Sequence, residues 1–266
     1  MLDTILKFAL ENKRPTGSRA IQELCNLLMA IVPEKSSQDD YGNVWVDLRG
    51  EHSATCFMGH LDTVHQEEGT NPVIWEPHRA WTGGVSVLGA DDGAGVALLA
   101  GLIAAGIPAL YLFTQEEECG GGGAQYVVNT FADVFYGIDR IVSFDRKGCH
   151  DICGEQWCGK CASRQYVSNL AEKLGMGHHW ARGTYTDNSE FQYLVPEIVN
   201  ISVGYEDCHT PMETLNLDYL HTMYAKCVAM DWEALQTFRD LANDEQEEYH
   251  FFSLPVKEWN PDLEVI

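Results

Sequence analysis

The sequence is poor in basic residues. Of its 266 residues, 17 are Lys or Arg whereas 40 are Asp or Glu, and the net charge is −23. Proteins that bind nucleic acids or anionic membranes do so largely through Lys and Arg, so we expect neither kind of partner. The excess of carboxylates instead favours solubility and produces a field that attracts cations.

The sequence also lacks the signals of export and of membrane insertion. Met1 is followed by neither the basic region nor the long apolar core of a secretory signal peptide. The apolar run at 96–113 is interrupted by Gly106 and Pro108, and its flanks carry no Lys or Arg of the kind found beside membrane segments. The nine cysteines, an odd number, are typical of reduced thiols and not of a disulfide framework. We therefore expect a cytoplasmic protein.

Helical and extended patterns alternate along the chain. We expect helices at 2–12, 18–31, 91–105, 124–130 and 217–241, and strands at 44–48, 55–58, 109–113, 138–144 and 198–204. Strands that alternate with helices predict an α/β fold, a three-layer sandwich in which helices flank a mostly parallel, twisted central sheet. The length and the 45% of hydrophobic residues suit one domain, with an acidic tail at about 243–266.

Three consecutive glutamates follow one of these expected strands. The run 109–113 leads into Glu116-Glu117-Glu118, and four glycines follow after Cys119. Adjacent like charges at the end of a strand repel one another, and bound cations are one means of holding them there. A solvated acidic loop is the simpler explanation, and an isolated triplet would favour it.

Other residues that commonly bind metals recur at the ends of other expected strands or at the start of a helix. These residues are His60, Asp62, Asp91, Asp92, Asp145 and His209. His60 and Asp62 are two apart in an extended segment and point the same way, so the carboxylate can fix the tautomer of a metal-binding imidazole. Sites in parallel sheets lie beyond the carboxyl ends of the strands, so we expect these side chains to meet. His65 and His78 lack such an acidic partner, and we interpret them as loop residues.

The order of these motifs resembles that of the co-catalytic zinc exopeptidases. This superfamily includes peptidase T-like tripeptidases, carboxypeptidase G-like enzymes and single-domain zinc aminopeptidases. The motifs are Gly59-His60-Leu61-Asp62, Gly89-Ala90-Asp91-Asp92-Gly93, Gln115-Glu116-Glu117-Glu118-Cys119-Gly120, Phe144-Asp145 and His209-Thr210-Pro211-Met212-Glu213. Each motif is weak alone, but five in this order, within a resemblance that spans about residues 15–225, are specific.

The resemblance implies two Zn²⁺ per chain, with Co²⁺ or Mn²⁺ as alternatives, and a role for each of seven residues. His60 and Asp145 would bind one ion, Glu118 and His209 would bind the other, and Asp91 would bridge them. Asp62 would orient His60, and Glu117 would be the general base. Two Zn²⁺, three ligand carboxylates and a bridging hydroxide make a neutral centre.

The family pattern also fixes the register of the glutamates. Relatives have Glu-Glu-x-Gly with Gly-Ala three residues later, which fits Glu117-Glu118-Cys119-Gly120 and Gly123-Ala124, whereas Glu116-Glu117 does not fit. Relatives carry a cis peptide bond after the bridging acid, so we expect one between Asp91 and Asp92.

The spacing of the motifs implies a catalytic domain without a lid. Asp62 and Asp91 are separated by 28 residues, and Asp145 and His209 by 63, which leaves no room for an inserted domain of the usual size. We expect a single catalytic metallopeptidase domain over 1–266, and a monomer in preference to a lid-mediated dimer. It would hydrolyse short peptides as an aminopeptidase or a di- or tripeptidase. An N-acyl amino acid deacylase or carboxypeptidase of the same fold is the alternative.

A protein without enzymatic activity is a further alternative. A small acidic protein can be a binding module, or a mimic of nucleic-acid charge that occupies a basic partner. Such a protein would scatter its acids over one surface, whereas these acids lie at strand ends among histidines. An enzyme-derived fold that has lost activity is disfavoured by the complete set of ligands.

Four cysteines, Cys149, Cys153, Cys158 and Cys161, lie within 13 residues of one another. Four thiolates can bind a structural zinc ion. The two pairs of such a site are usually a dozen or more residues apart, whereas only four residues separate Cys153 from Cys158. We therefore expect ordinary reduced thiols.

Overall fold

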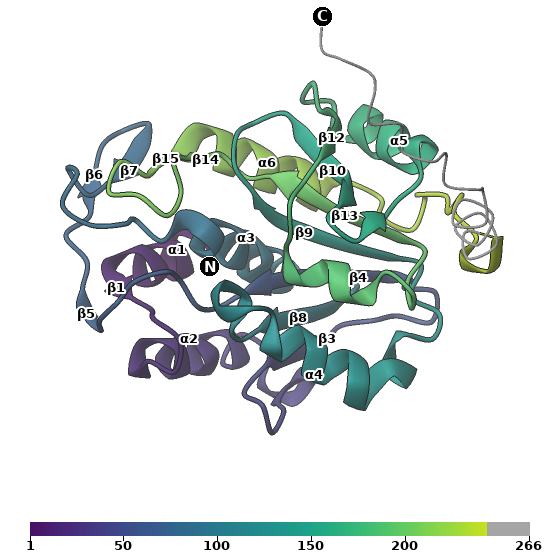
Figure 1. Ribbon diagram of the computed structural model, residues 1–266, viewed down its shortest axis with the longest axis horizontal. Coiled ribbons are helices and arrows are strands. Elements are labelled where there is room, and N and C mark those ends of the chain that lie inside the picture. The colour runs from purple at the N-terminus through teal and green to yellow at the C-terminus, as the bar shows by residue number, and fades with distance from the viewer. Residues whose placement is uncertain (244–266) are drawn as a thin grey trace, which may run out of the picture.

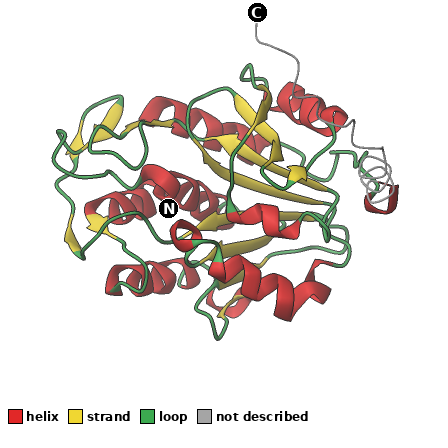
Figure 2. Ribbon diagram, viewed as in Figure 1, coloured by secondary structure: helices red, strands yellow, loops and turns green. Residues whose placement is uncertain are grey.

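A computed structural model describes residues 1–243 and shows a central sheet between two layers of helices (Figures 1 and 2). The sheet has nine strands. Its order is β11 (Gly159–Lys160), β10 (Asp151–Gln156), β13 (Glu197–Ser202), β9 (Arg140–Arg146), β4 (Thr55–His60), β8 (Leu110–Thr114), β3 (Val44–Asp47) and β2 (Ser36–Gln38), with β12 (His179–Arg182) beside β10. The four central strands β13, β9, β4 and β8 are parallel, and the outer pairs are antiparallel except β10 with β12. The expected three-layer α/β fold is confirmed.

The central strands are buried on both faces, as their continuous apolar sequences predict. Alternate side chains of a strand point to opposite faces, so the sheet separates two hydrophobic cores. Phe57, Tyr111 and Val142 belong to one core, and Met58 and Leu112 belong to the other.

The first core is covered by α1 (Leu2–Glu11), α2 (Arg19–Met29), α3 (Ala90–Ala104), α5 (Arg164–Leu174) and α6 (Leu217–Ala229). The second is covered by α4 (Gly122–Phe131) and the short 3₁₀ helices η3 (Ala132–Phe135) and η4 (Asp187–Phe191). Every residue of α3 from Ala90 to Ile103 is buried, which places its N-terminus inside the protein. The run 96–113 is therefore a buried helix followed by strand β8, as expected.

Short strands form a second sheet beside the first. β14 (Tyr205–Glu206), β15 (Thr214–Asn216), β7 (Arg79–Trp81) and β6 (Ile74–Trp75) are neighbours in that order. A separate pair joins β1 (Asn12–Lys13) to β5 (Gly69–Thr70). The two remaining 3₁₀ helices are η1 (Pro33–Lys35) and η2 (Glu117–Cys119). The loop that bears His209 connects β14 to β15, so the small sheet anchors both ends of this loop.

The helix expected at 217–241 is shorter than the sequence pattern predicts. It begins at Leu217, where the Asn216 side chain accepts a hydrogen bond from the backbone N–H of Tyr219, and it ends at Ala229. Beyond Met230 the backbone groups bond to buried charged side chains instead of to helix partners. The carbonyls of Trp232 and Leu235, for example, accept hydrogen bonds from the Arg140 guanidinium.

Two further expectations concern the membrane and the tail. Among residues 1–243, no helix combines the length and the apolar character needed to cross a membrane. The acidic tail expected at about 243–266 lies outside the described residues from 244 onwards.

Candidate metal centre

The structure brings all seven predicted site residues together at the carboxyl ends of the parallel strands. His60 ends β4, Asp62 follows it, Asp91 lies at the start of α3, Glu117 and Glu118 lie in η2 after β8, Asp145 lies near the end of β9, and His209 follows β14. Potential ligand atoms lie within 4.8 Å of one another in three groups. The groups are His60, Asp91 and Asp145; His60, Glu117 and Glu118; and Asp91, Cys208 and His209.

The Asp91 carboxylate lies between two histidines. Its Oδ1 is 3.2 Å from Nε2 of His60, and its Oδ2 is 3.1 Å from Nε2 of His209. Beyond the first histidine, Oδ1 of Asp145 lies 3.6 Å from Nε2 of His60. Beyond the second, Oε1 of Glu118 lies 3.0 Å from Nε2 of His209. Two groups of donor atoms thus share one carboxylate.

The second ring nitrogen of His60 faces the main chain. Nδ1 lies 3.1 Å from the carbonyl oxygen of Asp62 and 3.6 Å from its Oδ1. A proton on Nδ1 donated to that carbonyl leaves the lone pair of Nε2 free to bind a metal. The Asp62 carboxylate also accepts hydrogen bonds from the backbone N–H groups of Glu117 and Glu118, at 3.1 and 3.3 Å. Asp62 therefore positions η2 as well as His60.

Three residues that hold Asp145 were not predicted. The Asn200 side chain accepts from the Asp145 backbone N–H at 2.8 Å and donates to its carbonyl at 2.7 Å. The Thr186 hydroxyl donates to Oδ2 of Asp145 at 2.7 Å, and the Tyr205 hydroxyl donates to Oδ1 at 3.2 Å. An amide within the apolar strand 198–203 is a signal that could have identified Asn200.

Glu213, the last residue of the fifth motif, holds the segment that carries Asp91. Its buried carboxylate accepts hydrogen bonds from four consecutive backbone N–H groups. These are the groups of Leu88, Gly89, Ala90 and Asp91, at 2.8–3.1 Å. Burial raises the pKa of Glu213 to about 7, although the hydrogen bonds from Gly89, Asp91 and Leu88 oppose the shift. Glu213 thus fixes the backbone that presents the shared carboxylate.

Asp92 and Arg14 lie beneath this segment. Asp92 is fully buried and accepts from the backbone N–H groups of His60 and Gly95, at 3.3 and 3.1 Å. Burial raises its pKa well above the usual value. Arg14 is also fully buried and donates to the carbonyls of Ala9, Leu61 and Gly89. The peptide bond between Asp91 and Asp92 is cis, as the resemblance predicts.

The acids of the centre carry opposing pKa shifts. Burial raises the pKa of Asp145 to about 7 and that of Glu117 to about 9. Burial has the same effect on Asp91, but hydrogen bonds from His209 and His60 outweigh it and lower the pKa. Contacts with the carboxylates of Asp91 and Glu118 in turn raise the pKa of His209 to about 10. Burial lowers the pKa of His60, but contacts with Asp145, Asp62 and Asp91 outweigh it and raise this pKa well above the usual value.

Within residues 1–243, one buried oxygen of the centre makes no hydrogen bond. Oε1 of Glu118 forms an ion pair with His209, 3.0 Å from its Nε2, and has no hydrogen-bond partner. The Glu118 side chain is 8% exposed. Buried carboxylate oxygens normally accept hydrogen bonds, so an oxygen whose partner is an imidazole nitrogen alone is available as a metal ligand.

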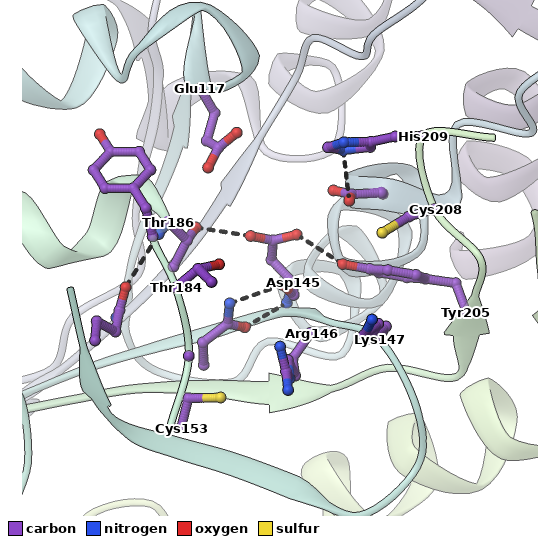
Figure 3. Close-up of a pocket in the computed structure, with 15 residues that line it drawn as sticks. Glu117, Asp145, Arg146, Lys147, Cys153, Thr184, Thr186, Tyr205, Cys208 and His209 are labelled. Carbon is purple, nitrogen blue, oxygen red and sulfur yellow. Dashed lines mark hydrogen bonds and ion pairs between the residues drawn. The ribbon is translucent and has the colours of Figure 1, made fainter. Parts of the chain in front are cut away.

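A pocket of about 250 Å³ opens onto these side chains (Figure 3). Glu117, Asp145 and His209 line one part of it, and their polar ends point into a common space. Arg146 and Lys147 lie on the opposite part. Arg146 pairs with Asp151 at 2.9 Å, whereas exposed Lys147 has no ion pair with any residue between 1 and 243.

The histidines and clustered cysteines that were not expected at the site make contacts outside it. His65 contacts Thr63 and the carbonyl of Val87, and exposed His78 pairs with Asp218. Of the four clustered cysteines, Cys158 and Cys161 have their sulfurs 3.5 Å apart. Within residues 1–243, none of the four belongs to a group of three potential metal ligands.

Comparison with known proteins identifies the fold. No protein-family model and no curated protein sequence matches the chain. Among solved structures, aminopeptidase PepT from Bacillus cereus superposes with a TM-score of 0.70 at 15% identity, covering 86% of this chain and 96% of that one. A tripeptidase from Staphylococcus aureus gives 0.69 at 14%, covering 85% and 95%. The TET1 peptidase from Pyrococcus horikoshii gives 0.65 at 16%, covering 86% and 98%. The fold expected from the resemblance is confirmed.

Proposed function

We propose that this chain is a metal-dependent exopeptidase that hydrolyses short peptides with two divalent ions, most simply Zn²⁺. The observation that carries the proposal is the Asp91 carboxylate, whose two oxygens face two histidines from opposite sides. A carboxylate shared in this way is the arrangement that a pair of neighbouring ions requires.

The residues present fit two ions. His60, Asp91 and Asp145 would hold one ion, and Asp91, Glu118 and His209 would hold the other. Imidazole and carboxylate are common Zn²⁺ ligands, and Co²⁺ or Mn²⁺ suit the same donors. A cation would also compensate the negative charge of Asp91, Asp145 and Glu118, which the fold brings together around the two histidines.

The chemistry divides between the ions and Glu117. Two bound divalent ions would supply an acidified water and a polarised substrate carbonyl. Glu117 would accept the proton of the attacking water on its carboxylate and transfer it to the nitrogen of the leaving amine. Its carboxylate lines the pocket (Figure 3) and lies near His60 of one proposed ligand set and Glu118 of the other.

The opposite part of the pocket favours a substrate with a free carboxylate. Lys147 is a cation without an ion-pair partner in the described chain, and it lies two residues after the ligand Asp145. It would attract the carboxylate of a di- or tripeptide. The same charge would suit an N-acyl amino acid, so deacylation is the second candidate function.

Metal analysis combined with a substrate panel tests the proposal. The purified chain should contain about two zinc ions by plasma mass spectrometry. It should hydrolyse leucine p-nitroanilide or short peptides, and chelation should remove the activity. Hydrolysis of N-acetyl amino acids without peptide cleavage would favour the deacylase. A chain that binds no divalent metal would refute both.

A further inference from the structure

One potential ligand at the centre belongs to neither predicted set. The sulfur of Cys208, a carboxylate oxygen of Asp91 and a ring nitrogen of His209 all lie within 4.8 Å of one another. Cys208 is half-buried, directly precedes His209 and lines the pocket. Figure 3 shows its sulfur on the same side of the pocket as the His209 ring.

The local backbone explains how two successive side chains face the same point. Adjacent side chains of an extended segment point to opposite faces, so a regular strand would separate Cys208 from His209. Here Asp207 and His209 have positive φ angles of 53° and 64°. Positive φ is uncommon for residues other than glycine and often occurs at functional sites. The Thr210 hydroxyl holds this turn by donating to the carbonyl of Asp207 at 2.8 Å.

The neighbouring acid supplies a second, independent observation. Glu118 faces His209 from the other side, and its buried Oε1 has no hydrogen-bond partner in the described chain. His209 therefore has two neighbours of different kinds: Asp91 and Cys208 in one ligand group, and Glu118 at 3.0 Å. An ion that binds His209 and takes Asp91, Glu118 and Cys208 as its other ligands would have the number of ligands that Zn²⁺ takes in tetrahedral sites.

We propose that Cys208 is a sulfur ligand of the ion that Asp91, Glu118 and His209 hold. This inference rests on the proposed function, because it requires a metal at the centre. The bond from sulfur to the ion replaces the S–H bond, and the proton leaves to solvent. The His209 site then has four protein ligands, whereas the His60 site has three and keeps a position open for water or substrate.

A sulfur ligand also changes which metals the two sites prefer. Thiolate favours soft or borderline ions such as Zn²⁺ and Cd²⁺, whereas carboxylate-rich sites accept Mn²⁺. The two sites of this centre should therefore differ: Mn²⁺ should compete poorly with Zn²⁺ at the His209 site and better at the His60 site.

Cobalt spectroscopy tests the assignment without relying on activity. The full chain is stripped of metal with a chelator and reloaded with Co²⁺ alone. A thiolate ligand produces an intense sulfur-to-cobalt charge-transfer band in the near ultraviolet, which nitrogen and oxygen ligands do not. We expect the band in the wild type and its loss in Cys208→Ser. We expect the weaker visible bands of both cobalt ions to remain in that variant.

Cys153 supplies the matched control. It also lines the pocket, but it belongs to no group of three potential ligands among the described residues. Cys153→Ser should keep the charge-transfer band. In the metal-free state, Cys208→Ser should have the melting temperature of the wild type. It should bind one of its two zinc ions at least about tenfold more weakly, because even the loss of a residue that only supports a ligand lowers metal affinity by about that factor.

Three results would overturn the proposal. Binding of two Co²⁺ by the wild type without the band would remove Cys208 as a ligand and leave the proposed function intact. A band that persists in Cys208→Ser, or disappears in Cys153→Ser, would assign the sulfur to another residue. Failure of the wild type to bind any cobalt would refute this proposal and the proposed function together. The wild-type spectrum decides the first and third results even if a variant does not fold.

Discussion

The two ends of the parallel sheet both bury charged side chains, but the protein satisfies these charges in different ways. At the amino ends of the strands, the Glu197 carboxylate is fully buried. It accepts hydrogen bonds from the backbone N–H groups of Ser163, Phe238 and Arg239 and from the Ser163 hydroxyl, at 2.7–2.9 Å. The Arg140 guanidinium beside it donates to Thr55, Trp232 and Leu235.

At the carboxyl ends, the acids face one another across the pocket. Asp91, Asp145 and Glu118 are close to histidines, and burial raises the pKa of Asp145 and of Glu117. The protein thus closes one end of the sheet with its own backbone donors and acceptors. At the other end it leaves negative charge for ions to neutralise. The same chemical change should therefore affect stability at one end and metal binding or catalysis at the other.

The largest effect is expected from loss of the proposed base. Glu117→Gln should lower kcat by about 10²–10⁴-fold, because the proton of the attacking water loses its acceptor. The zinc content should stay near two per chain, because no ligand is removed. Steady-state peptidase assays measure kcat, and plasma mass spectrometry measures the zinc content.

Glu116→Gln is the matched control, because Glu116 lies next to Glu117 but belongs to none of the three ligand groups and accepts from the Tyr41 hydroxyl. It should keep both zinc ions and most of the activity. Loss of one zinc ion in this variant, with both kept in Glu118→Gln, would contradict the assignment of Glu117 and Glu118.

The next largest effect compares one substitution at the two ends of the sheet. Glu197→Gln should lower the free energy of unfolding by at least about 3 kcal/mol, since an amide N–H₂ would face buried donors. Asp145→Asn should change the metal-free value at pH 8 by no more than about 1 kcal/mol, because the buried carboxylate it replaces is itself unfavourable there. Urea denaturation of chelator-treated protein measures both. Equal losses in the two variants would show that the ends do not differ in this way.

Removal of Asn200 should weaken the metal centre without removing a ligand. Asn200→Ala deletes both hydrogen bonds that hold the Asp145 backbone. Loss of such supporting contacts typically costs about 10–100-fold in metal affinity. Competition with a chromophoric chelator gives the affinity. Asn129→Ala, on the exposed face of α4, should leave it unchanged.

Stability should depend on pH in opposite directions with and without metal. In the metal-free protein, Asp145 and Glu117 have pKa values raised to about 7 and 9, so their contribution is present at low pH and is lost as pH rises through those values. His209, with its pKa raised to about 10, changes stability in the same direction. The pKa of Asp91 is lowered, so its contribution to stability is lost only in acid. The metal-free melting temperature should therefore fall between pH 5 and 9.

Zinc should reverse this trend, because metal ligands bind in their deprotonated forms. The increase in melting temperature on adding Zn²⁺ should grow over the same pH interval. Differential scanning calorimetry with and without Zn²⁺ compares the two curves. A metal-free melting temperature that rises from pH 5 to 9 would contradict the shifts assigned to Asp145 and Glu117.

The smallest effect is expected at the cysteines of the β10–β11 hairpin. Replacing Cys158 and Cys161 together by serine should leave the zinc content near two per chain and the melting temperature within a few degrees. A loss of one zinc ion with a large loss of stability would show that these thiols bind a structural ion.

The sequence predicted those parts of the site that lie on single segments. Apolar runs identified the strands, and the polar residues that follow them, such as His60 and Asp145, occupy one edge because parallel strands place their carboxyl ends together. The roles of the individual ligands were inferred from the family resemblance, and they stay predictions.

The supporting residues could not be predicted in the same way, because they act across the sheet. Asn200 contacts Asp145 through the pairing of β13 with β9, and Glu213 reaches back 122 residues or more to hold the Asp91 segment. The predicted length of α6 was wrong for a related reason. Trp232 and Leu235 continue the helical spacing of apolar residues, but their carbonyls bond to Arg140, which lies far away in the sequence.

The segment 231–239 also has a consequence for the order of events during protein synthesis. A chain extended only to Ala229 already contains every strand of the central sheet and every proposed metal ligand. It still lacks the carbonyls that accept from Arg140 and the N–H groups of Phe238 and Arg239 that bind Glu197. Domains acquire their structure as units while the ribosome releases them. Because these bonds are missing from a nascent chain that ends at Ala229, we expect the domain to reach its full stability only after residues 231–239 have left the ribosome.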